Sequence, residues 1–319
     1  MNILITGATG FIGQAVVQDL IAHTNYRLTA LTRKTSHALI QGIERLVVDT
    51  IDGSTDYGER LKGFDVIIHL AARVHQHNEN PETSYPAYKA LNVDGTQNLA
   101  RQAAMAGIKR FIFLSTIKVS GEATPQGKPF TADDPPNPSD AYSISKHEAE
   151  CALVTLSENS AMKYVIIRPP LVYGPGVKAN FEKLMGVVSR GLPLPFGSID
   201  NRRSLVSLDN LTSLIRRCID HPNAANEVFL VSDDRDVSTT ELLHILADAM
   251  EVRDRLILFP KAVLSFFAVI FGKKNISQRL LDNLQADISK TKSLLGWKPD
   301  TRLEDAIRTT ARNYLLQAK

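Results

Sequence analysis

A tyrosine and a lysine that stand four residues apart are the first residues in this sequence to suggest chemistry. Tyr142 and Lys146 lie in the stretch AYSISK, and on a helix this spacing places both side chains on one face. A cation within ~4–6 Å of a phenol stabilises the phenolate and lowers its pKa from about 10. The pair can therefore exchange a proton with a substrate hydroxyl near neutral pH. Because the same spacing occurs by chance on many solvated helices, the interpretation depends on the surrounding residues.

A hydroxyl residue upstream supplies that context. The run FIFL at 111–114 is typical of a strand, and Ser115 and Thr116 follow it. In doubly wound sheets ligands bind at the carboxyl ends of the strands, where Thr116 is expected to lie. Its hydroxyl can donate to a developing oxyanion or orient a substrate hydroxyl, and the structural alternative is a bond to backbone at the strand end. Thr116, Tyr142 and Lys146 are the predicted catalytic residues.

A glycine-rich turn near the N-terminus predicts a phosphate-binding site. The expected strand at 3–6 runs into GATGFIG at 7–13, and a helical segment follows at 14–21. Glycines allow close approach of a pyrophosphate, whose charge is favoured by free N–H groups at the helix N-terminus. A turn that needs glycine only for its backbone geometry is the alternative. The predicted dinucleotide contacts in this segment are Gly7, Thr9, Gly10, Phe11, Ile12 and Gly13.

Residues at the end of the second expected strand indicate whether NAD or NADP binds. It reads LTRK at 31–34 and lacks the acidic residue that binds the ribose 2′-hydroxyl in NAD sites. Arg33 can instead meet a 2′-phosphate, which favours NADP over NAD. An ordinary solvated surface charge is the competing interpretation of Arg33.

The elements that must position these residues alternate along the chain. Short β-branched runs and longer amphipathic segments alternate to about residue 170, which predicts an α/β fold, a doubly wound parallel sheet with helices on both faces. Proline and glycine breakers beyond Pro169 indicate a second lobe. We expect a dinucleotide-binding domain at 1–170 plus about 203–232, and a smaller mixed α/β substrate lobe at about 171–202 and 233–319. The expected strands are 3–6, 28–32, 45–48, 66–70, 111–114 and 164–168, with a further strand and helix at about 205–218 returning to the first domain.

Composition excludes several classes of protein. The net charge of +3 and the lack of like-charge runs argue against nucleic-acid binding. Two cysteines without zinc or disulfide spacing predict a reducing, cytoplasmic setting and no metal site, and Cys151 is interpreted as a small core residue. The N-terminus has no signal-peptide pattern. The apolar stretch at 262–271 is shorter than the ~20 residues of a spanning helix. It predicts a buried helix or, alternatively, a membrane-surface contact.

Together these residues resemble the extended short-chain dehydrogenases/reductases, specifically the nucleotide-sugar epimerase/dehydratase family, along nearly the whole chain. The resemblance implies a Rossmann-type domain, and it implies NAD or NADP as cofactor. Asp49 resembles the family's adenine-contacting acid, HLAA at 69–72 its fourth-strand signature, and RPPLVYGPG at 168–176 its crossover into the substrate lobe. Further cofactor contacts implied by the resemblance are Leu70, Ala71, Ala72, Asn92, Pro169 and the Tyr142–Lys146 pair.

The same resemblance implies a UDP-sugar substrate. Asn180 and Arg203 fall where UDP-sugar enzymes contact the nucleotide diphosphate, and Arg279 is a candidate for a second arginine there. A guanidinium fork suits phosphate oxygens, although either arginine can equally form a structural salt bridge. The segment STIKV at 115–119 is more similar to bacterial 4-ketoreductases and epimerases of UDP-N-acetyl-hexosamines than to UDP-glucose 4-epimerases. Lys118 is therefore a candidate substrate contact or, equally, an outward-facing charge.

The predicted reaction is hydride transfer between C4 of a UDP-hexose or UDP-N-acetyl-hexosamine and the nicotinamide, for surface polysaccharide biosynthesis. If the cofactor stays bound and returns the hydride to the 4-keto sugar, the enzyme is a 4-epimerase. If fresh NADPH reduces a supplied keto sugar, it is a 4-ketoreductase, and Arg33 and the Lys118 segment slightly favour this second reaction. The alternatives are a non-catalytic NADP-binding redox-sensing regulator and a nucleotide-sugar dehydratase. By analogy with the family, helices at 94–106 and 143–156 are expected to pair in a homodimer.

Overall fold

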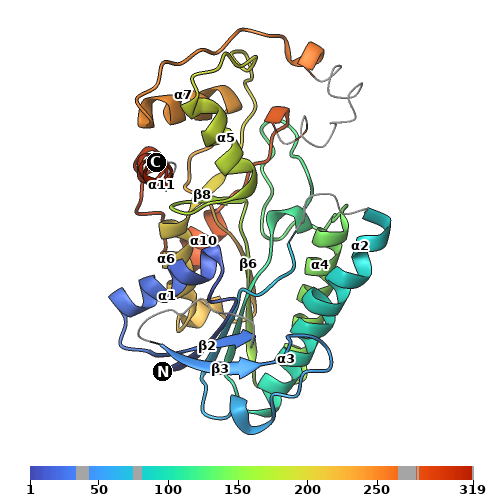
Figure 1. Cartoon of the computed structure of the whole chain (residues 1–319). Helices are drawn as coiled ribbons and strands as arrows, with labels where there is room; N and C mark the ends of the chain where they lie inside the picture. The colour runs from blue at the N-terminus through green and yellow to red at the C-terminus, as the bar shows by residue number, and fades with distance from the viewer. Residues whose placement is uncertain (34–42, 75–80, 265–277, 279, 318–319) are drawn as a thin grey trace.

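A seven-stranded parallel sheet forms the centre of the computed structural model, which describes residues 1–33, 43–74, 81–264, 278 and 280–317 (Figure 1). The strand order is β3-β2-β1-β4-β5-β6-β9, so the chain winds outward from β1 in both directions. The six expected strands all form, and each lies within one residue of its expected ends. The strands are β1 Asn2–Thr6, β2 Arg27–Arg33, β3 Glu44–Val48, β4 Val66–His69, β5 Arg110–Leu114, β6 Lys163–Arg168 and β9 Glu227–Leu230.

Helices cover both faces of this sheet, which confirms the doubly wound fold. Helices α1 Phe11–His23 and α6 Leu208–Cys218 lie on one side (Figure 1). The other side carries α2 Pro81–Tyr88, a π-helical turn at Lys89–Asp94, α3 Gly95–Met105 and α4 Ala141–Glu158.

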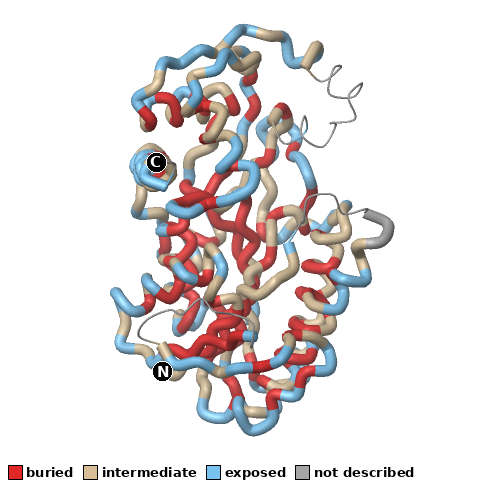
Figure 2. The backbone as a smooth tube through the Cα atoms, viewed as in Figure 1, coloured by how far each residue is buried: buried red, intermediate tan, exposed pale blue. Residues whose placement is uncertain are grey.

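Strand β1 contributes to two hydrophobic cores because alternate side chains of a strand point to opposite faces. Ile3 and Ile5 belong to the core beneath α1 and α6, whereas Leu4 belongs to the core beneath α3 and α4. Buried residues accordingly run through the middle of the sheet (Figure 2). This burial on both faces explains why the strand reads as a continuous apolar run.

A third core lies beyond the carboxyl ends of the strands. It is built on β7 Leu171–Tyr173 and β8 Leu205–Ser207, which pair in a separate two-stranded parallel sheet. The strand at 205 was expected to return to the first domain; β8 pairs with β7 and not with the seven-stranded sheet, while its Val206 belongs to the core beneath α1 and α6. The helix that follows, α6, does pack on α1. Helices α5 Ala179–Ser189, α7 Thr239–Ala249 and α11 Leu303–Gln317 complete this core, and a short α10 Ser289–Leu295 packs near β9.

Two expectations concern segments that are only partly described. Most of the apolar stretch at 262–271 lies outside the described residues, and so does Arg279. Within the described part of the chain, no helix has the length and apolar character needed to cross a bilayer. The division of the chain between the two expected domains stays a prediction.

Candidate active site

The glycine turn after β1 has the close contacts that a phosphate cradle requires. Gly7 has a φ of +68°, and a Cβ added there would lie 2.7 Å from the backbone nitrogen of Ala71. A Cβ on Gly13 would lie 2.1 Å from the carbonyl oxygen of Gly7. Helix α1 starts without a side-chain cap and without an acidic residue in its first turn. The turn therefore fits an anionic diphosphate, which the N–H groups at the helix N-terminus would bind.

A buried histidine holds the end of β4 against this turn. His69 Nδ1 lies 2.7 Å from Thr6 Oγ1, and its Nε2 lies 3.0 Å from Thr96 Oγ1. Thr6 Oγ1 also accepts the backbone N–H of Ala71 at 3.1 Å. Burial, with a smaller contribution from the Lys146 charge, lowers the pKa of His69 to about 3, so the imidazole stays neutral. The segment Leu70–Ala72 is thus fixed beside Gly7 by threonines that sequence analysis did not identify.

Helix α4 carries the predicted tyrosine and lysine. The helix begins with a capping box in which Asp140 accepts the N–H of Ser143 at 2.7 Å. Lys146 is 2% exposed, and its ammonium lies 3.9 Å from the centroid of the Phe113 ring on β5. The ring of Tyr142 is partly buried and meets Tyr88 edge to face, at 6.2 Å between centroids.

Asn92 connects α4 to the end of β4. Its side-chain amide donates to Ser145 Oγ at 3.0 Å and to the carbonyl oxygen of Arg73 at 3.1 Å, and it accepts the N–H of Arg73 at 2.8 Å. The residue lies in the π-helical turn, a form of helix that often occurs at functional sites. This role explains why the sequence places an asparagine here within a helix. Whether Asn92 also meets the cofactor stays a prediction.

Burial changes the pKa of both members of the pair. Burial raises the pKa of Tyr142, and the charge of Asp140 and the neighbouring Tyr88 raise it further. A lowering of this pKa by the Lys146 charge is not among the causes of the shift and stays a prediction. Burial lowers the pKa of Lys146 to about 7, while the charge of Glu150 acts in the opposite direction. At neutral pH the Tyr142 phenol is therefore protonated, and Lys146 is divided between its charged and neutral forms.

Thr116 follows β5 and is linked to the start of α4 by an ion pair. Its Oγ1 accepts the backbone N–H of Lys118 at 3.3 Å, which is the structural alternative expected for this residue and leaves the hydroxyl proton to donate. Lys118 Nζ lies 2.7 Å from Asp140 Oδ2 and 2.9 Å from Glu122 Oε1. Because Asp140 is two residues before Tyr142, this contact brings the Thr116 segment next to the tyrosine. Lys118 itself is occupied by two carboxylates.

The predicted substrate residues Asn180 and Arg203 lie together. They line one cavity of about 140 Å³ with Phe181, Leu184 and other apolar side chains of the third core. Arg203 also donates from Nη1 to the carbonyl oxygen of Asp282 at 2.9 Å. A mostly apolar hollow with an amide and a guanidinium is suited to a flat ring that carries phosphate.

Arg33 and Asp49, which lie at the carboxyl ends of β2 and β3, are both exposed. Arg33 ends β2 and pairs in register with Val48, so Asp49 lies beside it at the same strand ends. Pro169 follows β6, and its carbonyl oxygen accepts the N–H of Ile117 at 2.9 Å. The predicted cofactor residues that follow strands therefore lie along the carboxyl ends of β1, β2, β3, β4 and β6.

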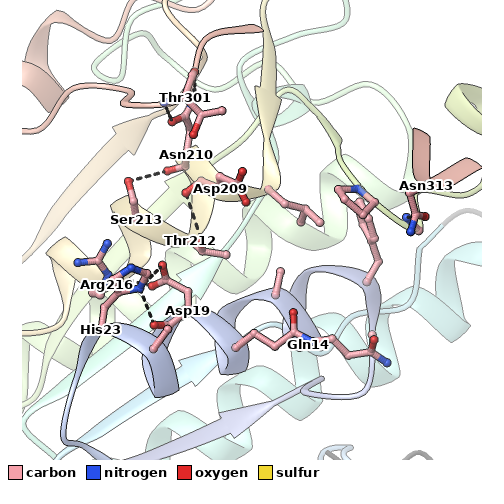
Figure 3. Close-up of a pocket in the computed structure, with 18 of the residues that line it drawn as sticks. Gln14, Asp19, His23, Asp209, Asn210, Thr212, Ser213, Arg216, Thr301 and Asn313 are labelled. Carbon is pink, nitrogen blue, oxygen red and sulfur yellow. Dashed lines mark hydrogen bonds and ion pairs between the residues drawn. The ribbon is translucent and has the colours of Figure 1, made fainter. Parts of the chain in front are cut away.

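A larger cavity, of about 950 Å³, lies between α1, α6 and α11, and Thr9, Gly10 and Phe11 of the glycine turn form part of its lining (Figure 3). It is crossed by an ion pair in which Arg216 Nε lies 2.9 Å from Asp19 Oδ2. None of the three predicted catalytic residues lines it. The cavity therefore adjoins the predicted dinucleotide turn and not the predicted catalytic residues.

Two further expectations concern metals and cysteine. Among the described residues no group of three histidine, cysteine or carboxylate side chains is placed to hold a metal ion. Cys151 was interpreted as a core residue, and this is wrong: the residue is exposed on α4, with its Sγ 3.7 Å from His147 Nε2. Cys218 is buried.

Comparison with known proteins places this geometry in context. Residues 3–232 match the model of the NAD dependent epimerase/dehydratase family. A UDP-glucose 4-epimerase of Vibrio cholerae is 48% identical over 316 residues, which cover 98% of this chain and 95% of that protein. The crystal structure of a Bacillus cereus UDP-glucuronic acid 4-epimerase in complex with NAD has a TM-score of 0.80 at 21% identity over 100% of both chains. A Thermotoga maritima UDP-glucose 4-epimerase with UDP-glucose has a TM-score of 0.77 at 23% identity, again over 100% of both.

Proposed function

The chain belongs to the NAD-dependent epimerase/dehydratase family, and from this premise we propose that it interconverts the C4 epimers of a UDP-hexose or UDP-N-acetyl-hexosamine. The supporting observation is the arrangement of Thr116, Tyr142 and Lys146. The ion pair between Lys118 and Asp140 joins their two segments, at the sheet edge that also carries the glycine turn. These are the groups that a reversible oxidation of a sugar alcohol requires.

Each side chain has a proposed role in this reaction. Bound NAD or NADP would supply the hydride acceptor and donor. The Tyr142 oxygen takes the proton from the 4-hydroxyl and returns it, while Thr116 donates a hydrogen bond that orients the same oxygen. Lys146 in its charged form stabilises the phenolate. The 4-keto sugar then turns over in the site, so that the hydride returns to the opposite face of C4 and the configuration there is inverted.

The substrate is proposed to enter with its nucleotide in the third core. The cavity that Asn180 and Arg203 line would take one end of the uridine diphosphate, with the guanidinium on phosphate. The 48% identical relative carries the name UDP-glucose 4-epimerase, which supports a UDP-hexose. The sugar's 2-substituent and a role in surface polysaccharide biosynthesis stay predictions, as do the homodimer and the cytoplasmic location.

Epimerisation is favoured here over reduction. The slight preference for a reductase rested on Arg33 and on the Lys118 segment, and two carboxylates occupy the Lys118 ammonium. A dehydratase would need an acidic residue beside Thr116 to remove a proton at C5, and Glu122 is engaged by Lys118. A redox-sensing regulator would not need the Tyr142–Lys146 pair.

A direct assay distinguishes these reactions. Purified protein is incubated with UDP-glucose, UDP-galactose or their N-acetyl counterparts, and products are separated by chromatography. We expect the same epimer ratio from either side without net consumption of reduced cofactor. Consumption of NADPH with a UDP-4-keto sugar, and no epimer formation, would replace epimerase by reductase. Failure in both assays would exclude both functions.

The choice of dinucleotide has its own test. Arg33 is exposed at the end of β2, where a 2′-phosphate would lie, and it predicts that NADP binds. Measured dissociation constants for NAD and NADP with the wild type and Arg33→Ala decide the question. A preference for NADP that the substitution abolishes would support the prediction. If Arg33→Ala weakens the binding of NAD and NADP equally, or changes neither, the prediction of an NADP preference is contradicted.

A further inference from the structure

A buried ion pair lies one helical turn beyond Lys146, outside the reaction as proposed. Arg168 ends β6 and donates from Nε to Glu150 Oε1 at 3.0 Å and from Nη2 to Glu150 Oε2 at 2.6 Å. Glu150 is 3% exposed and Arg168 is 4% exposed. The two-point geometry is the strong, directional form of an arginine–carboxylate contact. It fixes the angle between α4 and the end of β6 as well as their separation.

The same arginine reaches the segment that carries Thr116. Its Nη1 donates to Ser120 Oγ at 3.3 Å, and Ser120 is buried. Backbone hydrogen bonds also hold this segment to β6: the N–H of Ser115 donates to Ile167 at 2.7 Å and that of Ile117 to Pro169 at 2.9 Å. Arg168 therefore links the Thr116 segment, the end of β6 and the helix of Tyr142 and Lys146.

Stability alone does not account for such a pair. Removing two charges from water is costly, and well-packed apolar residues of similar volume often stabilise a fold equally well or better. Burial favours the neutral acid, but hydrogen bonds from His147 and Arg168 and the Arg168 charge hold the pKa of Glu150 below its usual value. The pair thus stays charged, and what it provides over an apolar contact is a fixed geometry.

We propose that Glu150 and Arg168 are positioning residues, a buried clamp that holds the hydroxyl of Thr116 in register with Tyr142 and Lys146. The proposal rests on the proposed function, because it assigns these three groups to one reacting oxygen. A displacement of about 1 Å at such a site can lower the rate about 100-fold without loss of binding. The clamp therefore acts on kcat and leaves the affinity for the UDP-sugar in place.

The test distinguishes an effect of the ion pair on the position of Thr116 from an effect on the stability of the fold. In the double variant Glu150→Met/Arg168→Met, apolar side chains replace the pair, so the fold keeps its packing while the directional contact is lost. Ser120→Ala is milder, because it keeps the ion pair and removes the link to the Thr116 segment. Asp19→Asn is the control, since it breaks a different ion pair, between α1 and α6, in a cavity that Thr116, Tyr142 and Lys146 do not line.

Three measurements are made on each variant: thermal unfolding, kcat and KM for epimerisation, and amide hydrogen exchange at Ile117 and Ser120. We expect the double variant to unfold near the wild-type temperature, with kcat lowered about 10-fold to 100-fold. KM should change by less than about threefold, and exchange at both amides should be faster. Ser120→Ala should give a smaller change in the same direction, and Asp19→Asn none.

Other outcomes overturn the clamp. Wild-type kcat and exchange in the double variant would show that the pair positions nothing. A rise in KM with unchanged kcat would assign the pair to substrate binding. If the wild type itself forms no epimer, the proposed function fails, yet amide exchange still decides whether the pair holds the Thr116 segment.

Discussion

Replacing Gly13 by alanine tests the phosphate-binding turn most directly. Gly13 lies inside α1, where alanine in place of glycine normally stabilises a helix by roughly 0.5–1 kcal/mol. Here the added Cβ would lie 2.1 Å from the carbonyl oxygen of Gly7 and 2.7 Å from Cα of Ala8. Both are backbone atoms, so no change of rotamer relieves the overlap. Such overpacking costs about 1–3 kcal/mol.

The expected balance is therefore a net loss centred on roughly 1 kcal/mol in the free energy of unfolding, despite the better helix former. Because relief requires the glycine turn to move, we also expect the dissociation constant for NAD to rise at least about tenfold, a cost of about 1.4 kcal/mol. Urea denaturation measures the first quantity and titration calorimetry the second. Both use the same purified protein.

A matched control is available in another helix. Gly186 lies in α5, and a Cβ there would lie 3.1 Å from Tyr314 Oη, the end of a side chain that can move. Gly186→Ala should leave NAD binding unchanged and alter stability by less than about 1 kcal/mol. If Gly13→Ala is as stable as this control and binds NAD with wild-type affinity, the geometric argument for the turn is refuted.

Three further predictions concern the proposed catalytic pair and the proposed nucleotide cavity. Tyr142→Phe should lower kcat about 10²-fold to 10⁴-fold in the epimer assay while the unfolding midpoint changes little. Burial lowers the pKa of Lys146 from 10.5 to about 7. The unfolded chain then binds more protons between these values, so wild-type stability should rise with pH across this window, and Lys146→Met, measured by urea denaturation, should lose that rise. Arg203→Ala should raise KM for the UDP-sugar more than it lowers kcat, measured by initial rates.

Local patterns predicted much of the fold. The strand at 28–32 became β2 Arg27–Arg33, because a buried β-branched run and its polar ends are both visible in sequence. The glycine turn, the Tyr142–Lys146 spacing and the HLAA and RPPLVYGPG segments together indicated the family, and the family model and the 48% identical relative confirm that assignment. These signals are all short-range.

Features that depend on distant contacts were not predictable in this way. Thr6 and Thr96 support His69 from 63 and 27 residues away, and nothing in their local sequence marks them. The sign of the Tyr142 pKa shift depends on burial, which spacing alone does not reveal. The pairing of β8 with β7 and the exposure of Cys151 likewise follow from the tertiary arrangement.

The position of β9 has a consequence for how this protein is made. Strand β9 lies beside β6 in the sheet, but the chain between Arg168 and Glu227 first builds β7, β8, α5 and α6. At about 5–20 residues per second on a ribosome, several seconds pass with the backbone edge of β6 unpaired. An open apolar strand edge is a template for association between nascent chains. Slow synthesis or truncation between these two strands should therefore favour aggregation more than truncation after β9.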